Sequence, residues 1–173
     1  GTTSFDHICE AVEEALGGKH LTKFDDLQKL VKTETNRILT TGGHYAHLKI
    51  AEGCDKHCTY CIIPYARGNN RSVPKEIILN QIEELLAQGF EEICLTGVDA
   101  CSYQPSFSDL VADILKKFPN LPSLQFGSLD PAAVDDDFIN LIGKCSNIYP
   151  LSSVRKFVPA NSIYKNQGEV VTK

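Results

Sequence analysis

The stretch Gly53-Cys54-Asp55-Lys56-His57-Cys58-Thr59-Tyr60-Cys61 decides how this chain is interpreted. Its three cysteines have the spacing C-x3-C-x2-C, and they follow an alternating apolar and polar run at 45–51 that predicts a strand. Three thiolates on one short loop can converge on one metal centre, and cysteine thiolates hold iron–sulfur clusters. Because a closed cluster takes four protein ligands, a three-cysteine loop leaves one iron open to a small molecule.

The alternative for the three cysteines is a structural zinc loop. Zinc takes four ligands, commonly from two C-x2-C pairs or from Cys/His pairs. His57 lies inside the loop and His44 and His47 lie nearby, so a Cys3His site is conceivable. No second ligand pair occurs at zinc-ribbon spacing, and the pattern therefore favours an iron–sulfur cluster.

This string, with the aromatic Tyr60 before the last cysteine, resembles the radical S-adenosylmethionine (SAM) enzymes. The resemblance implies that Cys54, Cys58 and Cys61 hold a 4Fe-4S cluster whose fourth iron is chelated by SAM. It also implies that the reduced cluster cleaves SAM to a 5′-deoxyadenosyl radical, which abstracts a hydrogen from the substrate. Tyr60 would then pack beside the cluster and the adenine of SAM; its alternative role is that of a core aromatic.

The longer string at 45–74 resembles the methylthiotransferases more narrowly, enzymes that replace a C–H with a C–SCH3 group. The first half of the chain is similar to those that act on a small-subunit ribosomal protein. The strings LTGVD at 95–99 and PNLPSLQFGSLDPAAVDDDFINLIG at 119–143 are more similar to those that act on threonylcarbamoyladenosine in tRNA.

The resemblance implies methylthiolation at a C–H bond of a ribosomal-protein aspartate. The alternative substrate is the modified adenosine next to the tRNA anticodon. An electron donor such as flavodoxin or ferredoxin is an implied partner. A second alternative, from a different functional class, is a non-catalytic metal-binding module built on the same loop.

The resemblance divides the chain into three parts. Residues 1–43 are expected to be the tail of an N-terminal methylthiotransferase domain plus a linker, residues 44–150 a partial radical SAM core, and residues 151–173 an unassigned tail. The expected fold is α/β: a partial parallel (β/α) barrel of the radical SAM type, with an N-terminal helix and linker from a preceding domain. A short strand could lie at 153–158.

Hydrophobic periodicity predicts the elements of the core. Strands are expected at 45–51, 92–97 and 124–129, in the strand–helix–strand order of a parallel βαβ unit. Four helices are expected: one that packs after Ser4, one that starts at 72–76 with Ser72 near its cap, one capped by Ser108, and one over 131–144.

Gly97, Val98 and Asp99 directly follow the second predicted strand. A glycine there lets the backbone approach a ligand closely, and the resemblance implies contact with the amino group of SAM. The alternative is a simple strand-to-helix turn.

Arg67 could pair with a carboxylate or phosphate through its planar fork of donors, or could stay unpaired at the surface. Residues 55–57 are expected to form a solvated loop surface. No general acid or base is assigned, because the cofactor supplies the difficult step.

Length, net charge and cysteine number limit the class of protein and the compartment that can be expected. The 173 residues fit one domain, and a net charge of −5 argues against gripping nucleic acid by charge alone. Seven cysteines, an odd number with three clustered, fit a reducing cytoplasm better than a disulfide framework. No run approaches the roughly 20 apolar residues of a membrane helix, so no membrane partner is expected.

Overall fold

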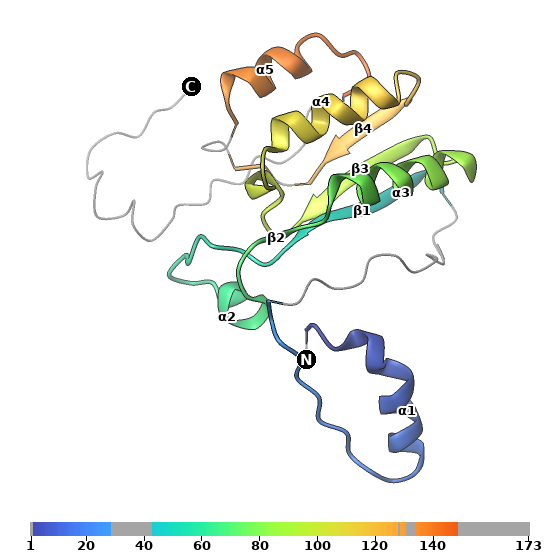
Figure 1. Cartoon of the computed structure of the whole chain (residues 1–173), viewed down its shortest axis with the longest axis vertical. Coiled ribbons are helices and arrows are strands. Elements are labelled where there is room, and N and C mark those ends of the chain that lie inside the picture. The colour runs from blue at the N-terminus through green and yellow to red at the C-terminus, as the bar shows by residue number, and fades with distance from the viewer. Residues whose placement is uncertain (1, 29–42, 128, 131–133, 149–173) are drawn as a thin grey trace.

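The computed structural model describes residues 2–28, 43–127, 129–130 and 134–148 (Figure 1). The possible strand at 153–158 and most of the expected linker therefore lie outside the described residues. The helices are the 3-10 helices η1 (Phe5–His7) and η2 (Ala100–Ser102), and α1 (Ile8–Leu16), α2 (Ile63–Arg67), α3 (Lys75–Ala87), α4 (Phe107–Lys117) and α5 (Asp136–Ile142). The strands are β1 (Tyr45–Glu52), β2 (Arg71–Ser72), β3 (Glu92–Gly97) and β4 (Ser123–Phe126).

The four strands form one sheet in the order β2-β1-β3-β4. β1 pairs with β3 and β3 with β4 in parallel, while the two-residue β2 pairs antiparallel with the end of β1. Helices α3 and α4 cover the same face of this sheet (Figure 1). The predicted partial parallel (β/α) barrel is confirmed for the described residues. Its carboxyl strand ends meet at one edge, where such folds carry their sites.

The core lies between the sheet and its helices. In β1 the alternation seen in the sequence becomes burial of Ala46, Leu48 and Ile50, and Ile78 and Ile82 of α3 are fully buried at helical spacing. Each of the buried leucine and isoleucine side chains contributes about 1.5–3 kcal/mol by leaving water. This packing fixes the strand ends on which the candidate site is built.

The start of α3 differs from the expectation. Ser72 lies two residues before the N-cap but does not cap the helix: it belongs to β2, and its Oγ accepts a hydrogen bond from Gln104 N at 2.7 Å. Pro74 occupies the N-cap position without a side-chain cap. The sequence favoured a helix start because serine followed by proline is typical of one. Residues 71–72 instead pair with the end of β1 and form an edge strand of the sheet.

The start of α4 also differs, by two residues. Its cap is Ser106, whose Oγ accepts a hydrogen bond from Asp109 N at 3.1 Å, and Ser108 already lies within the helix. The order Ser106-x-x-Asp109 matches the sequence signature of a helix N-terminus.

The last two elements are shorter than expected. β4 ends at Phe126 rather than at residue 129. α5 begins at Asp136 rather than at residue 131, because Asp135 Oδ1 accepts a hydrogen bond from Phe138 N at 2.7 Å and caps the helix there. Residues 131–133 lie outside the described residues, and Val134 precedes the helix.

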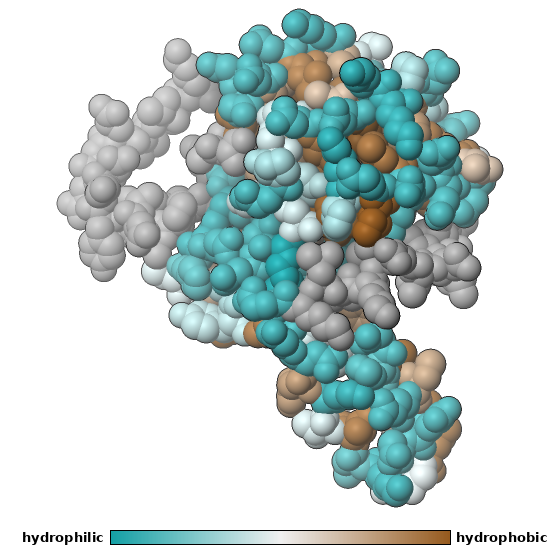
Figure 2. Space-filling view, viewed as in Figure 1, coloured by the Kyte–Doolittle hydropathy of each residue, from teal (hydrophilic) through white to brown (hydrophobic). Residues whose placement is uncertain are grey.

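Helix α1 forms as predicted but does not pack as expected. None of its residues is buried, and Ile8, Val12 and Leu16 are 61%, 50% and 85% exposed. In Figure 1 it lies apart from the sheet, and Figure 2 shows hydrophobic residues at this part of the surface. The helical spacing predicted an apolar face, but it did not show whether another element packs against that face. Within the described part of the chain, none of the helices has the length and apolarity that crossing a membrane requires.

Candidate metal and cofactor site

The cysteine loop begins with a glycine that the backbone requires. Gly53 has φ +81°, and a Cβ added to it would lie 2.0 Å from Asn69 O. Cys54 N donates to Gly68 O at 3.1 Å directly beside it. The start of the loop is therefore clamped against residues 68–69, and only glycine fits this position.

Two further features shape the loop. His57 has φ +43°, a left-handed conformation that is uncommon for a residue with a side chain. Cys61 N then donates to Cys58 O at 2.9 Å, and Asp55 Oδ1 accepts from Asn70 N at 3.1 Å. In this loop conformation the three cysteines line one hollow.

That hollow is a cavity of about 80 Å³ at the carboxyl edge of the parallel strands. Six of the seven predicted site residues line it, and the structure brings them together from the cysteine loop and the end of β3. Its lining consists of Cys54, Lys56, Cys58, Tyr60, Cys61, Ile63, Val98, Asp99 and Asp130.

Gly97 is the predicted site residue that does not line the cavity. A Cβ there would lie 3.2 Å from Ala51 O and 3.3 Å from Ala100 Cα. The glycine thus permits close packing between the end of β3, the neighbouring strand and η2. Its position next to Val98 still sets where the following backbone enters the cavity.

Tyr60 lies at the rim of the cavity. Its side chain is 72% exposed, so the alternative of a core aromatic is wrong. An accessible ring beside the three cysteines is free to cover a ligand in the cavity. In contrast, Cys58 is buried and Cys54 and Cys61 are partly buried.

Lys56 forms the main charge cluster of the cavity. Its ammonium hydrogen-bonds Asp130 and lies 3.2 Å from Asp99 Oδ1. The side chains of Asp99 and Asp130 are only 6% and 9% exposed and come from the ends of β3 and β4. The expectation that Lys56 belongs to a solvated loop surface is wrong, because its largely buried ammonium pairs with two buried carboxylates.

These charges have direct consequences for proton affinity. Burial opposes a charged Lys56, but the hydrogen bond to Asp130 and the charge of Asp99 raise its pKa above the ordinary value. Burial raises the pKa of the Cys54 thiol, whose Sγ lies 4.0 Å from Asp99 Oδ2. Metal binding at Cys54 must therefore displace a proton that the site holds firmly.

The described residues show no preformed tetrahedral zinc site at the cysteine loop. Tetrahedral zinc with Zn–S bonds of about 2.3 Å needs sulfurs about 3.8 Å apart. Among the described residues, the three thiols do not form a group whose ligand atoms all lie within 4.8 Å of one another. His44 and His47 lie at the far end of β1, at least about 16 Å along the strand from the loop. Of the three histidines considered, only His57 therefore remains near enough to join the cysteines in a Cys3His site.

Arg67 does pair with a carboxylate, as one of its two predicted roles required. Its Nη1 lies 2.6 Å from Glu52 Oε1, and Lys49 Nζ lies 2.6 Å from Glu52 Oε2. Burial favours a neutral Glu52, but these two cations lower its pKa below the usual range. The pair ties the end of α2 to the end of β1, on either side of the cysteine loop.

Three lining residues, Lys56, Ile63 and Asp130, were not predicted from the sequence. No local pattern distinguishes Lys56 from an ordinary loop lysine. Asp130 had a usable signal, because it follows the third predicted strand and the carboxyl ends of parallel strands meet at one edge. Asn70 was also missed; its Nδ2 donates to Asp99 O at 2.9 Å and links the cysteine loop to the end of β3.

Comparison with known proteins decides the family. The model of the radical SAM superfamily matches residues 48–143, which includes the cysteine loop, β3 and β4. The chain belongs to the radical SAM superfamily. Enzymes of this superfamily use a 4Fe-4S cluster and SAM.

Curated relatives narrow the likeness within the superfamily. The chain is 37% identical over 147 residues to the ribosomal protein uS12 methylthiotransferase RimO of Lachnoclostridium phytofermentans, covering 82% of this chain and 33% of the relative. It is 34% identical over 133 residues to the threonylcarbamoyladenosine tRNA methylthiotransferase MtaB of Rickettsia prowazekii, covering 73% and 32%. The chain therefore spans about a third of the length of these relatives.

A solved structure gives a weaker likeness. The radical SAM methyltransferase TsrM of Kitasatospora setae, solved with cobalamin and a [4Fe-4S] cluster, has a TM-score of 0.49 and 20% identity. The match covers 57% of this chain and 18% of TsrM.

Proposed function

We propose that this chain carries the cluster-binding and SAM-binding core of a radical SAM methylthiotransferase. The observation that carries the proposal is the convergence of Cys54, Cys58 and Cys61 on one cavity at the carboxyl edge of the parallel sheet. Their three-thiol donor set fits a 4Fe-4S cluster with one iron left for SAM. Relatives named as methylthiotransferases support the reaction class.

The seven predicted site residues and Lys56 each have a role in this proposal. The three cysteines hold the cluster, and Tyr60 at the rim covers the adenine of SAM. Val98 and Asp99 face the amino group of SAM, and Gly97 sets their backbone. When bound, the cluster and SAM supply the radical that abstracts a hydrogen from the substrate. The protein binds and orients both groups, and the Lys56 ion pairs hold the loop in place.

For the substrate we propose an aspartate of a ribosomal protein. Two RimO relatives, at 37% and 40% identity, support this choice. The net charge of −5 also gives this part of the protein no general attraction for phosphate. The alternative is tRNA, supported by MtaB and by a tRNA-2-methylthio-N(6)-dimethylallyladenosine synthase of Thermotoga petrophila that is 33% identical.

The proposal also includes an electron donor, a cellular compartment and a domain arrangement. An electron donor such as flavodoxin or ferredoxin would reduce the cluster, in a reducing cytoplasm that suits seven free thiols. Residues 1–43 would be the tail of an N-terminal methylthiotransferase domain plus its linker, and 44–150 the partial radical SAM core.

Anaerobic reconstitution with iron and sulfide tests the cluster. We expect about four irons per chain, together with the absorbance and paramagnetic signals of a 4Fe-4S cluster. Cys58→Ala should lose them, and the matched control Cys9→Ala should keep them, because Cys9 is exposed on α1 and distant in sequence from the loop. One zinc and no iron in the wild type would overturn the proposal in favour of the metal-binding module.

Two further measurements test SAM binding and the identity of the substrate. SAM titration should perturb the paramagnetic signal of the reduced cluster, and an unchanged signal at saturating SAM would refute SAM binding. Methylthio mass is then sought on ribosomal protein and on tRNA from cells with and without the gene. A gene-dependent mass on tRNA alone would replace the ribosomal-protein substrate by the alternative, and its absence from both would refute the transferase.

A further inference from the structure

Asn70 contacts two parts of the site that come from different elements. Its main-chain N donates to Asp55 Oδ1 at 3.1 Å, inside the cysteine loop. Its side-chain Nδ2 donates to Asp99 O at 2.9 Å, two residues beyond the end of β3. One residue therefore joins the loop that carries the three thiols to the segment whose Asp99 lines the cavity.

The backbone around Asn70 is held in place by its neighbours. The buried Arg71 donates from Nη1 to the main-chain oxygens of residues 67 and 69, at 3.0 and 3.1 Å. Between these two oxygens, Gly68 O accepts from Cys54 N at 3.1 Å. Because the residues on both sides are fixed, the amide of Asn70 reaches Asp99 from a defined position.

The orientation of the Asn70 amide shows which of its groups the site uses. Nδ2 faces the carbonyl of Asp99, while Oδ1 is buried and has no hydrogen-bond partner among the described residues. A reversed amide would place an oxygen against the Asp99 oxygen. The donor contact therefore sets the orientation, even though an unpaired buried acceptor is unfavourable.

The contacts of Asp99 divide between its carboxylate and its main chain. Oδ1 lies 3.2 Å from Lys56 Nζ, and Oδ2 accepts from Ser102 Oγ at 2.7 Å. The main-chain oxygen accepts from Ser102 N at 3.3 Å and from Asn70. Ser102 lies in the turn that Asp99 begins, so it moves with Asp99. The hydrogen bond from Asn70 instead ties the Asp99 backbone to the cysteine loop.

We propose that Asn70 is a positioning residue for SAM: it sets the spacing between the cysteine loop and Asp99, so that both can bind one SAM molecule. This inference rests on the proposed function, in which the loop holds the cluster and Asp99 faces the SAM amino group. A ligand that contacts two elements binds more tightly when the protein holds them at the right spacing beforehand. Loss of the amide donor should therefore weaken SAM binding and leave the cluster ligands in place.

Asn70→Asp is the main test. Aspartate keeps the size of the side chain and the main-chain donor to Asp55, but it places a carboxylate oxygen against Asp99 O. The added negative charge alone would attract SAM, whose sulfonium, ammonium and carboxylate give a net charge of +1. Charge and positioning therefore predict opposite signs. We expect the SAM dissociation constant to rise at least about tenfold, as for changes behind metal ligands.

Asn69→Asp is the matched control, because it makes the same change one residue away. The Asn69 side chain is exposed and makes no hydrogen bond among the described residues, and aspartate keeps the main-chain oxygen that Arg71 holds. Its SAM dissociation constant should stay within about twofold of the wild type, since an exposed charge acts weakly. Asn70→Ala removes the donor without adding charge and should weaken binding about fivefold, the equivalent of one hydrogen bond.

The experiment reconstitutes each variant anaerobically, counts its iron, and titrates SAM against the paramagnetic signal of the reduced cluster. We expect about four irons per chain in every variant, with weaker SAM binding only in the two Asn70 variants. Equal SAM affinity in Asn70→Asp and Asn69→Asp would overturn the inference and leave the proposed function intact. Loss of iron in Asn70→Asp would also overturn it, by making Asn70 a structural residue of the loop. A wild type that does not bind SAM would refute the proposed function itself.

Discussion

Gly53 offers the sharpest test of how the cysteine loop is built. In Gly53→Ala the new methyl group would lie 2.0 Å from Asn69 O, which is 1.4 Å short of an ordinary contact at 3.4 Å. Either the loop or residues 68–69 must therefore move by more than an ångström. Such a movement also breaks the hydrogen bond from Cys54 N to Gly68 O.

Gly89→Ala is the matched control for this change. Gly89 has φ +90°, close to the +81° of Gly53, but a Cβ there meets nothing within 4 Å. Both variants therefore incur the strain of a left-handed non-glycine residue, about 1–2 kcal/mol. Only Gly53→Ala adds overpacking of about 1–3 kcal/mol and a lost hydrogen bond of about 1 kcal/mol. We expect total losses of about 3–6 kcal/mol for Gly53→Ala against about 1–2 kcal/mol for Gly89→Ala.

The assay combines urea unfolding under reducing conditions with iron counting after anaerobic reconstitution. Gly53→Ala should lower both the free energy of unfolding and the iron content, because the displaced loop no longer directs three thiols to one cavity. Gly89→Ala should keep its iron. Equal losses in the two variants would refute the reasoning, since their backbone strain is shared and only the steric contact differs.

Three further changes test the surrounding structure by urea unfolding. Lys56→Met leaves two buried carboxylates without their counter-ion and should cost about 3–5 kcal/mol; a loss below about 1 kcal/mol would mean that the pairs behave as exposed ones. Tyr103→Phe removes the buried hydrogen bond to Val73 O and should cost about 1–3 kcal/mol. Burial raises the pKa of Tyr103, so the free energy of unfolding of the wild type falls as pH rises above about 10. The difference in this free energy between wild type and Tyr103→Phe should therefore narrow above that pH, and a constant difference would contradict the assignment. Phe138→Ala opens a cluster of three phenylalanine rings and should cost about 3–5 kcal/mol. Its control is Ile139→Ala, which should change stability by about 0.5 kcal/mol at most because Ile139 is 51% exposed. Similar losses in the two variants would contradict the assigned burial.

Local patterns in the sequence were sufficient for the parallel core. The alternation in 45–51 and the helical spacing of Ile78 and Ile82 are signals of single elements, since burial on one face repeats with the period of the backbone. Element starts were less predictable. Ser72 and Ser108 are both plausible caps by residue type, and their neighbours in space decide which role each takes.

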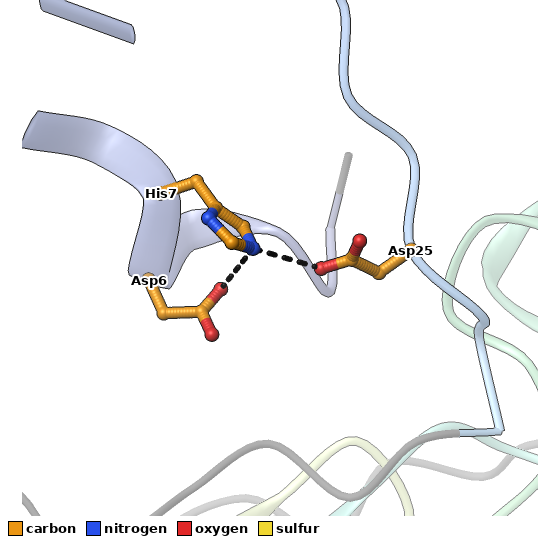
Figure 3. Close-up of side chains that lie close together, drawn as sticks. All are labelled: Asp6, His7 and Asp25. Atoms are coloured by element: carbon orange, nitrogen blue, oxygen red, sulfur yellow. Dashed lines mark ion pairs between the residues drawn. The ribbon is translucent and has the colours of Figure 1, made fainter. Parts of the chain in front are cut away.

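The sequence by itself determined the three thiols, their spacing and their place after a strand, because these are properties of adjacent residues. Only the tertiary structure decided that Lys56 is a buried ion-pair partner. Its two carboxylates, Asp99 and Asp130, lie 43 and 74 positions away in the sequence and meet it only because parallel strands end at one edge. The same holds for the pairing of Asp25 with His7 (Figure 3), which depends on a segment without periodicity. Residues joined through space leave no local pattern, and their charges and distances exist only in the folded chain.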